Sequence, residues 1–273
     1  MTIMGVHPDA VSFSLLGPVS ASVGDERVTV TGRRQRVILS LLVLARGRMV
    51  PVATLVDAVW GERAPLSARA RVALDVVALR KAFRAAGHSG TLIAGTRSGY
   101  RLCTERAGFD VREFDDLVAA ADRAAARGEA RRAGVLYGGA LDLWSGPALE
   151  GVGGRLTETA AARLEARRRT VCEALLTVGR GLADDGFFDE AEQALRDALR
   201  AAEGAGATGP AAEAHLALGR LHLTLHRLGQ ARRHLRAAAT LGEERAVGEL
   251  AALAERGSGA KEALDLVPRQ TVR

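Results

Sequence analysis

A forty-residue internal repeat restricts the fold of this chain more than any other feature of its sequence. One set of small and large residues recurs at identical spacing, and the two copies are Gly179, Ala191, Leu195, Ala198 and Gly219, Ala231, Leu235, Ala238. A looser copy is Ala121, Ala133, Tyr137 and Ala140. The small residues let paired helices approach, and the large residue fills the gap between them. A repeated unit of this length predicts helix pairs that stack on one another.

The spacing within the repeat is that of a tetratricopeptide repeat. From about Asp110 the sequence is rich in alanine and has no strand signal. It therefore predicts an all-α, tetratricopeptide-like domain over residues 110–255. Within this domain we expect 204–210 to be a turn between repeats. After it, we expect 256–273 to be a flexible tail.

The first hundred residues have a different pattern, in which short β-type runs alternate with turn signals. The expected elements begin with three strands, the last being Arg27–Val30, and a helix from Arg33 that stops at Gly47. An extended piece and a short helix that stops at Gly61 follow. Next come a third helix, with Pro65 in its first turn and its end at Gly87, and a β-hairpin over 91–103 with Arg97 at its tip. Strands, three helices and a terminal hairpin form the order of a winged helix. The sequence predicts an α+β winged helix-turn-helix domain over residues 12–104.

The positive charge lies in this first part of the chain. Residues 1–104 hold 14 Lys/Arg against 6 Asp/Glu, a net charge of +8, whereas the remainder holds 24 against 26, a net charge of −2. Only Lys81 and Lys261 are lysine, so nearly all of the positive charge is guanidinium, which suits phosphate because it donates two parallel hydrogen bonds. The asymmetry indicates a polyanion-binding module joined to a protein-facing one.

Several motifs resemble the SARP-type antibiotic pathway regulators of actinobacteria. They are LLGPVSA, RRQRVILSLLVLARGRMVPVATLVDAVWG, ALRKAF, SGYRL, FDVREFDDLV and ALDLWSGPALEGV, between about Phe13 and Leu176. The resemblance implies an OmpR-type winged helix joined to a bacterial transcriptional activation domain. It also implies a sequence-specific activator of a biosynthetic gene cluster that binds promoter DNA as two adjacent copies and contacts RNA polymerase. No phosphate-loop motif is present, so the chain resembles the short form of the family.

The candidate DNA-binding residues are basic side chains on the elements that would flank DNA in a winged helix. They are Arg33 and Arg34 at the start of the first helix, Arg71, Arg80, Lys81 and Arg84 on the third helix, and Arg97 and Arg101 on the hairpin. Phosphate contacts of this kind position the protein, while contacts to base edges specify the site.

The base-reading part of the third helix lacks the usual readers. Relatives commonly carry a pattern such as Gln-Val-Tyr-Val-Ser-Arg where this chain has 73–78, Ala-Leu-Asp-Val-Val-Ala. Alanine and valine can touch a thymine methyl but cannot make bidentate hydrogen bonds. Asp75 on the outward side would repel phosphate, accept from cytosine, or pair with Arg71 at i, i+4. We expect weaker or less specific binding than in the relatives, or specificity moved to the wing and to DNA shape.

No feature of the sequence predicts an enzyme, a cofactor or a metal centre. His215, His222 and His226 fall on one helix face, and the last two have the spacing of paired metal ligands, but no nearby Cys or Glu completes a set. We interpret them as packing residues, and a buried neutral imidazole pair could also make the domain sensitive to pH. Cys103 and Cys172 are far apart and are expected to be reduced.

The functional prediction is a transcriptional activator of a secondary-metabolite gene cluster. Its expected partners are double-stranded promoter DNA, RNA polymerase and a second copy of the chain on DNA. No signal peptide or long apolar run is present, so we expect a cytoplasmic protein without a membrane partner. The alternative is a protein-interaction or ligand-sensing module whose winged helix has lost specific DNA binding.

Overall fold

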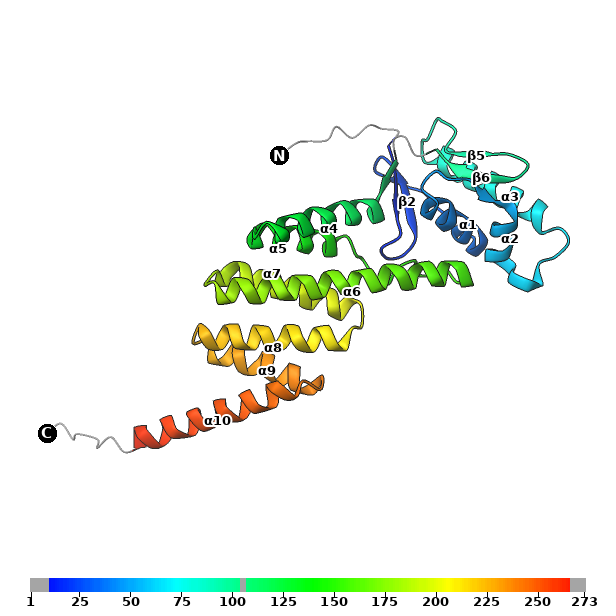
Figure 1. Ribbon diagram of the computed structural model, residues 1–273. Helices are drawn as coiled ribbons and strands as arrows, with labels where there is room; N and C mark the ends of the chain where they lie inside the picture. The colour runs from blue at the N-terminus through cyan, green and yellow to red at the C-terminus, as the bar shows by residue number, and fades with distance from the viewer. Residues whose placement is uncertain (1–9, 104–106, 266–273) are drawn as a thin grey trace. The chain divides into compact units, whose positions relative to one another are not determined.

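The computed structural model describes residues 10–103 and 107–265, with side chains described as far as residue 255 (Figure 1). Two compact units are present. Unit 1 contains the chain up to Ala119 together with Asp142–Arg168, and unit 2 contains Ala120–Leu141 and the chain from Arg169 onward. Unit 1 thus holds more of the chain than the expected 12–104, since it includes a segment from within the expected 110–255.

A small sheet opens unit 1, with strand order β3-β2-β1-β7. Its strands are β1 (Val11–Ser14), β2 (Ser20–Val23), β3 (Glu26–Arg27) and β7 (Ala107–Phe109). β1 pairs antiparallel with β2 and parallel with β7. Val11 and Phe13 are buried and alternate with less buried serines, as expected for a sheet with one face on a core. The third strand is shorter than the expected Arg27–Val30, and the pairing with β7 was not predicted.

Three helices and a hairpin form the winged helix. They are α1 (Arg33–Leu44), α2 (Val52–Trp60) and α3 (Ala68–Ala85), and the second sheet has the order β4-β6-β5, with β4 (Val50–Pro51), β5 (Ile93–Gly95) and β6 (Gly99–Leu102). A 3₁₀ turn, η1 (Gly61–Arg63), follows α2. The predicted stops have the left-handed backbone that glycine adopts most readily, with φ of 81° at Gly47 and 98° at Gly87. Pro65 precedes α3 instead of lying in its first turn, because the helix begins at Ala68.

The segment 142–168 packs onto the start of the chain within unit 1. The backbone N–H of Ser145 donates to the carbonyl of Leu16 at 2.8 Å, and that of Leu149 donates to the carbonyl of Leu15 at 2.9 Å. The Trp144 ring lies edge-on to Phe114 with 5.6 Å between centroids. The glycine-rich run 151–154 precedes α6 (Arg155–Asp184).

Unit 2 consists of helices in the described residues, and the predicted helix pairs are present. Unit 2 contains the end of α4 (Asp110–Ala126), the second part of α6, and α5 (Ala130–Asp142) except for its last residue. Its remaining helices are α7 (Phe188–Gly204), α8 (Thr208–Thr224), α9 (Leu228–Thr240) and α10 (Glu244–Asp265). A Cβ on Gly179 would lie 2.9 Å from the side chain of Leu195, and one on Gly219 would lie 2.7 Å from Leu235. The repeat in the sequence therefore corresponds to equivalent close helix contacts.

Two expected boundaries in unit 2 differ from the structure. The turn expected over 204–210 is shorter, because α7 ends at Gly204 and α8 begins at Thr208. α10 continues to Asp265, so the first ten residues of the expected 256–273 tail are helical, while 266–273 lie outside the described residues.

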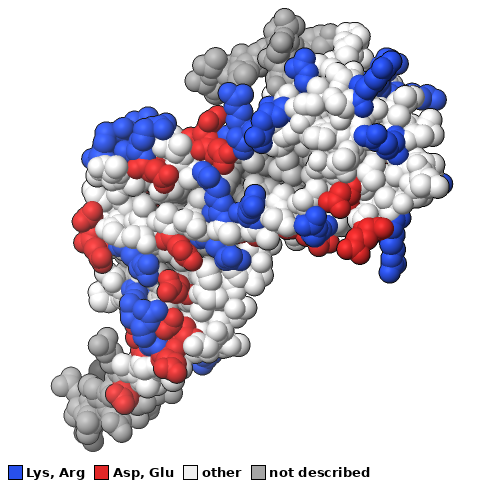
Figure 2. Space-filling model, turned by 45° about the vertical axis from the view of Figure 1, so that its right-hand side comes forward, with Lys and Arg blue, Asp and Glu red and all other residues white. Residues whose placement is uncertain are grey.

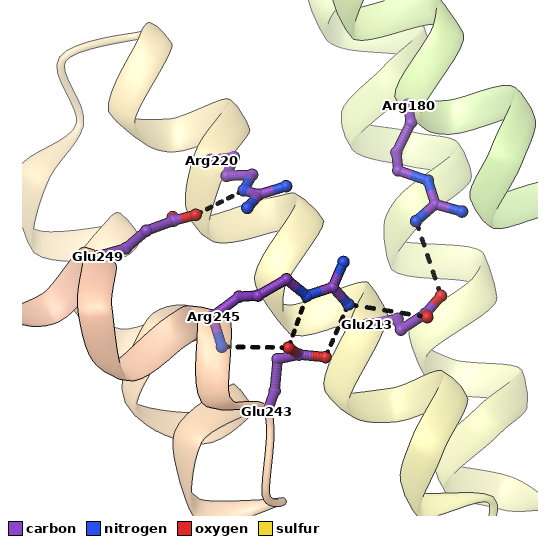
Figure 3. A network of polar contacts seen from close by, with 6 residues as sticks. All are labelled: Arg180, Glu213, Arg220, Glu243, Arg245 and Glu249. Carbon is purple, nitrogen blue, oxygen red and sulfur yellow. Dashed lines mark hydrogen bonds and ion pairs between the residues drawn. The ribbon is translucent and has the colours of Figure 1, made fainter.

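A polar network joins α6, α8 and α10 (Figure 3). Arg220 on α8 donates to Glu249 on α10 at 2.6 Å. Glu213 on α8 lies 3.7 Å from Arg180 on α6 and 3.9 Å from Arg245 on α10. A cavity of about 220 Å³ lies beside this network, floored by apolar residues of α7 and α8. Because each arginine faces a carboxylate, the network ties α6 and α10 to α8, which lies between them in sequence.

Candidate nucleic-acid interface

The third helix, α3, has one fully buried face and one exposed face. Val72, Val76, Leu79 and Phe83, which recur at helical spacing, are at most 1% exposed. On the opposite side the side chains of Ala70, Leu74, Val77, Lys81 and Arg84 follow one another at i, i+4, i+7, i+11 and i+14, and all are exposed. Leu74 and Val77 are 68% and 57% exposed, which is high for apolar side chains. A winged helix presents such a face of its third helix to the major groove.

The position of Asp75 corrects the sequence interpretation. It was expected on the outward side of α3, but it is only 6% exposed, and its Oδ2 accepts a hydrogen bond from Arg34 Nε at 2.9 Å. This bond and the nearby charge raise the pKa of Arg34 above its ordinary value. The side chain of Arg34 remains 48% exposed, and its guanidinium lies 6.0 Å from the centre of the Trp60 ring. Asp75 therefore fixes α1 to α3 and takes its negative charge away from the reading face.

The pair considered between Asp75 and Arg71 is absent. Arg71 Nε donates instead to Ser67 Oγ at 3.1 Å, at the start of the same helix. The reason is geometric, because Asp75 turns into the core toward α1, whereas Arg71 is exposed. Arg71 thus lies on the outer surface of α3 with its Nε engaged locally.

Arg80 connects α3 to the hairpin. Its Nε and terminal nitrogen both donate to the carbonyl of Ile93 on β5, at 3.1 and 2.9 Å. The side chain is only partly exposed and lines a cavity with Arg84, His88 and the chain from Gly90 to Gly95. This bond holds the base of the wing against α3, so Arg80 positions the wing in addition to adding charge.

The hairpin places two basic residues on the surface. Arg97 is exposed in the turn between β5 and β6, where Thr96 Oγ1 and Ser98 Oγ share a hydrogen bond of 2.8 Å. Arg101 is exposed on β6, opposite Ala94 of β5. The predicted hairpin with an arginine tip is therefore present.

Arg33, the first residue of α1, lies beside the loop that precedes α6. A Cβ on Gly153 would lie 2.9 Å from the Arg33 guanidinium, and one on Gly151 would lie 3.2 Å from that of Arg36. Arg33 is exposed, as is Lys81 on α3. The start of α1 is thus bordered by a glycine-rich segment that sequence reasoning did not connect with it.

Figure 2 shows Lys and Arg side chains that are separated by uncharged surface instead of forming one continuous block. Sequence reasoning identified the basic residues and placed 73–78 in the base-reading part of the helix, but it did not single out Leu74 and Val77 as the exposed apolar residues there. A helical projection from the buried Val72 and Val76 would have placed both on the outer face. No local signal could have paired Arg34 with Asp75, because 41 residues separate them.

The histidines do not form a metal site in the structure. His226 follows the end of α8, is exposed and has a φ of 54°, so it leaves the expected helical face. His234 of α9 takes its place, with its Nδ1 2.9 Å from Nδ1 of His215 and its ring centroid 5.5 Å from that of fully buried His222. Burial lowers the pKa of all three rings, that of His234 to about 4. No group of three or more His, Cys, Asp or Glu that could hold a metal occurs among the described residues.

Two protein families match this chain in sequence. Residues 25–102 match the family described as "Transcriptional regulatory protein, C terminal", and residues 109–180 match the "Bacterial transcriptional activator domain". No helix in the described part of the chain is both long and apolar enough to cross a membrane.

The chain is also similar to individual regulators. It is 36% identical over 168 residues to the regulatory protein AfsR of Streptomyces griseus, and 34% identical over 171 residues to the regulatory protein DnrI of Streptomyces peucetius. These matches cover 62% and 60% of this chain, but only 17% of AfsR and 63% of DnrI. A solved structure of Mycobacterium tuberculosis EmbR with a low-affinity phosphopeptide matches 90% of this chain and 72% of EmbR, with a TM-score of 0.53 and 25% identity.

The structure has a winged helix over the region that matches the first family, 25–102, and a series of helices over the region that matches the second, 109–180. Both findings agree with the resemblance found in the sequence. The chain therefore belongs to the SARP-type regulators, a family of transcriptional regulators and not of enzymes.

Proposed function

We propose that this chain is an activator that binds promoter DNA and promotes transcription of a secondary-metabolite gene cluster, such as one for an antibiotic. The observation that carries the proposal is the outer face of α3, which is exposed at one residue in each helical turn from Ala70 to Arg84 and bordered by basic residues of the helix and the wing. A protruding helix of this kind fits the major groove, and arginine and lysine beside it bind phosphate.

The eight basic residues divide into two groups in this proposal. The first group binds phosphate through its guanidinium or ammonium groups. It contains Lys81, Arg84, Arg97 and Arg101, together with Arg33 and Arg71 at the borders of the interface. Arg34 and Arg80 position the interface, because their Nε groups bind Asp75 and the carbonyl of Ile93. In the same proposal, two copies bind adjacent DNA sites, and the helical unit contacts RNA polymerase.

A second candidate function is supported by other observations. Two exposed leucines, Leu74 on α3 and Leu66 just before it, suit a protein partner. The cavity beside Arg180, Arg220 and Arg245 suits a small ligand. In this alternative, the chain is a protein-interaction or ligand-sensing module whose winged helix has lost specific DNA binding.

Fluorescence anisotropy over a range of salt concentrations separates the two functions. Labelled DNA from the native upstream promoter region is compared with a scrambled duplex of equal composition. We expect tighter binding to the native duplex, and we expect Lys81→Ala and Arg97→Ala to weaken binding to both duplexes and reduce the salt slope by about 1 each. Equal affinity for the native and scrambled duplexes at every salt concentration would refute the proposal and favour the second function.

A further inference from the structure

We propose that α3 selects its DNA site through the 5-methyl groups of pyrimidines, thymine above all, by means of an apolar stripe formed by Ala70, Leu74 and Val77. This inference rests on the proposed function, because it assigns the specificity of the same interface. It goes beyond DNA binding, since it names the chemical group that is read and the side chains that read it.

The stripe lies on the ridge of α3 that is farthest from the core. Ala70, Leu74 and Val77 occupy i, i+4 and i+7, opposite the buried Val72 and Val76. Leu74 and Val77 keep more than half of their surface accessible, at 68% and 57%. When such a helix enters a major groove, these are the side chains that meet base edges first.

None of the stripe side chains can form a hydrogen bond with a base. The flanking Ala73 and Ala78 cannot do so either. Asp75, the acceptor nearest in sequence, is withdrawn into the core by its bond to Arg34. The apolar group that the major groove offers to such a surface is the C5 methyl of thymine.

Charged side chains border the stripe at both ends. Arg69 and Arg71 lie near its first residue, and Lys81 and Arg84 continue its line beyond Val77. Phosphate contacts from these residues would hold the helix in the groove, so the stripe itself need only distinguish one base edge from another. This arrangement of an apolar centre and basic borders fits DNA better than it fits an apolar protein surface.

A comparison of four base pairs tests the proposal on DNA sites that the protein itself selects. Sites are first selected by the full chain from a random duplex library. Each thymine of a selected site is then replaced singly to give T·A, U·A, 5-methylcytosine·G and C·G at the same position. Uracil lacks only the methyl of thymine, whereas 5-methylcytosine restores the methyl on a pair with different hydrogen-bonding groups.

The expected order of affinity at contacted positions depends on the methyl alone. T·A and 5-methylcytosine·G should bind more tightly than U·A and C·G, by about fourfold for each methyl, which is the factor for burying one such group. Thymines in the flanks of the same duplex serve as the internal control and should show no difference. A U·A duplex that binds as tightly as T·A at every position overturns the proposal.

Variants assign the effect to the stripe. Leu74→Ala and Val77→Ala should each weaken the preference for the methylated pairs, because each shortens the apolar side chain that meets the methyl. Both should leave the salt slope unchanged, since neither residue binds phosphate. Leu66→Ala removes a fully exposed leucine outside the stripe and is the matched control. If both stripe variants keep the methyl preference of the unaltered chain, the stripe does not read DNA.

The failure of this inference differs from the failure of the proposed function. A selection that enriches a motif whose binding ignores the methyl overturns the inference and leaves the activator in place. A selection that enriches no motif, with salt-dependent binding equal for all duplexes, overturns both. Circular dichroism of each variant confirms that a lost preference is not lost folding.

Discussion

The ion pair between Arg34 and Asp75 gives a prediction with opposite effects on stability and on DNA binding. Asp75→Asn keeps the size of the side chain but removes the charge that holds Arg34. Hydrogen bonds to charged groups contribute about 1.5–3 kcal/mol when buried, and exposed pairs about 0–1 kcal/mol. Here the Asp75 side chain is 8% exposed and that of Arg34 is 48% exposed. We therefore expect a loss of about 1 kcal/mol, or a fall of about 2–4 °C in Tm for a chain of this size.

The same substitution should strengthen DNA binding. Once released from Asp75, the Arg34 guanidinium can bind a phosphate beside α3, and each such contact adds about 0.9 to the slope of log affinity against log salt. We expect Asp75→Asn to bind duplex DNA more tightly at low salt, with a steeper salt dependence and little change in preference between sequences. Differential scanning fluorimetry and anisotropy between 50 and 200 mM salt, roughly the range over which such contacts are screened, measure the two effects.

Asp57→Asn is the control, because it changes the net charge equally. Asp57 pairs with Arg155 at 3.2 Å, but both side chains are exposed, at 46% and 80%, and Arg155 lies outside the proposed interface. This variant should change the free energy of unfolding by no more than about 0.5 kcal/mol and leave the salt slope unchanged. If both variants strengthen DNA binding equally, total charge explains the gain, and the reasoning about Arg34 is wrong.

Two further predictions concern the helical unit. Gly219→Ala would place a Cβ 2.7 Å from the side chain of Leu235, so it should destabilise the unit by about 1–3 kcal/mol in urea unfolding, whereas Gly181→Ala, with nothing within 4 Å, should stabilise it by up to about 1 kcal/mol. Equal effects would contradict the close helix approach. Burial lowers the pKa of His234 to about 4, below the unfolded value of about 6.5, so its contribution to stability is complete above pH 6.5 and is lost as pH falls toward 4. Replacing His234 with Leu should flatten this pH dependence of the urea midpoint, while replacing the exposed His226 with Gln should not.

Features set by local periodicity could be predicted from the sequence. Val72, Val76, Leu79 and Phe83 repeat at helical spacing, and that spacing alone identifies a buried face. The forty-residue offset between Gly179 and Gly219 likewise identifies equivalent helix contacts, because a small residue recurs wherever two helices approach. The hairpin could also be predicted from local sequence, because glycines flank the turn at its tip.

Features that depend on contacts between distant parts of the chain could not be predicted. Asp75 lies three residues after Val72 and four before Leu79, so its helical position borders the buried face, but its partner Arg34 lies on another helix and could not be identified from the third helix alone. His234 joins His215 and His222 from a different helix, which periodicity within α8 cannot reveal. In each case the deciding partner is supplied by the fold.

One run within the motifs of the resemblance, Trp-Ser-Gly-Pro at 144–147, has a structural explanation in unit 1. The backbone N–H of Ser145 donates to the carbonyl of Leu16. A Cβ on Gly17 would collide with the Ser145 side chain, so the two backbones approach closely only because residue 17 is glycine. Trp144 fills the space beside Phe114. These contacts bury Leu15 and Leu16, which are 1% exposed, at the end of the strand that begins the winged-helix unit. The motif therefore completes the core on which the winged helix is built, and it lies outside the region 25–102 that matches the regulatory domain by sequence.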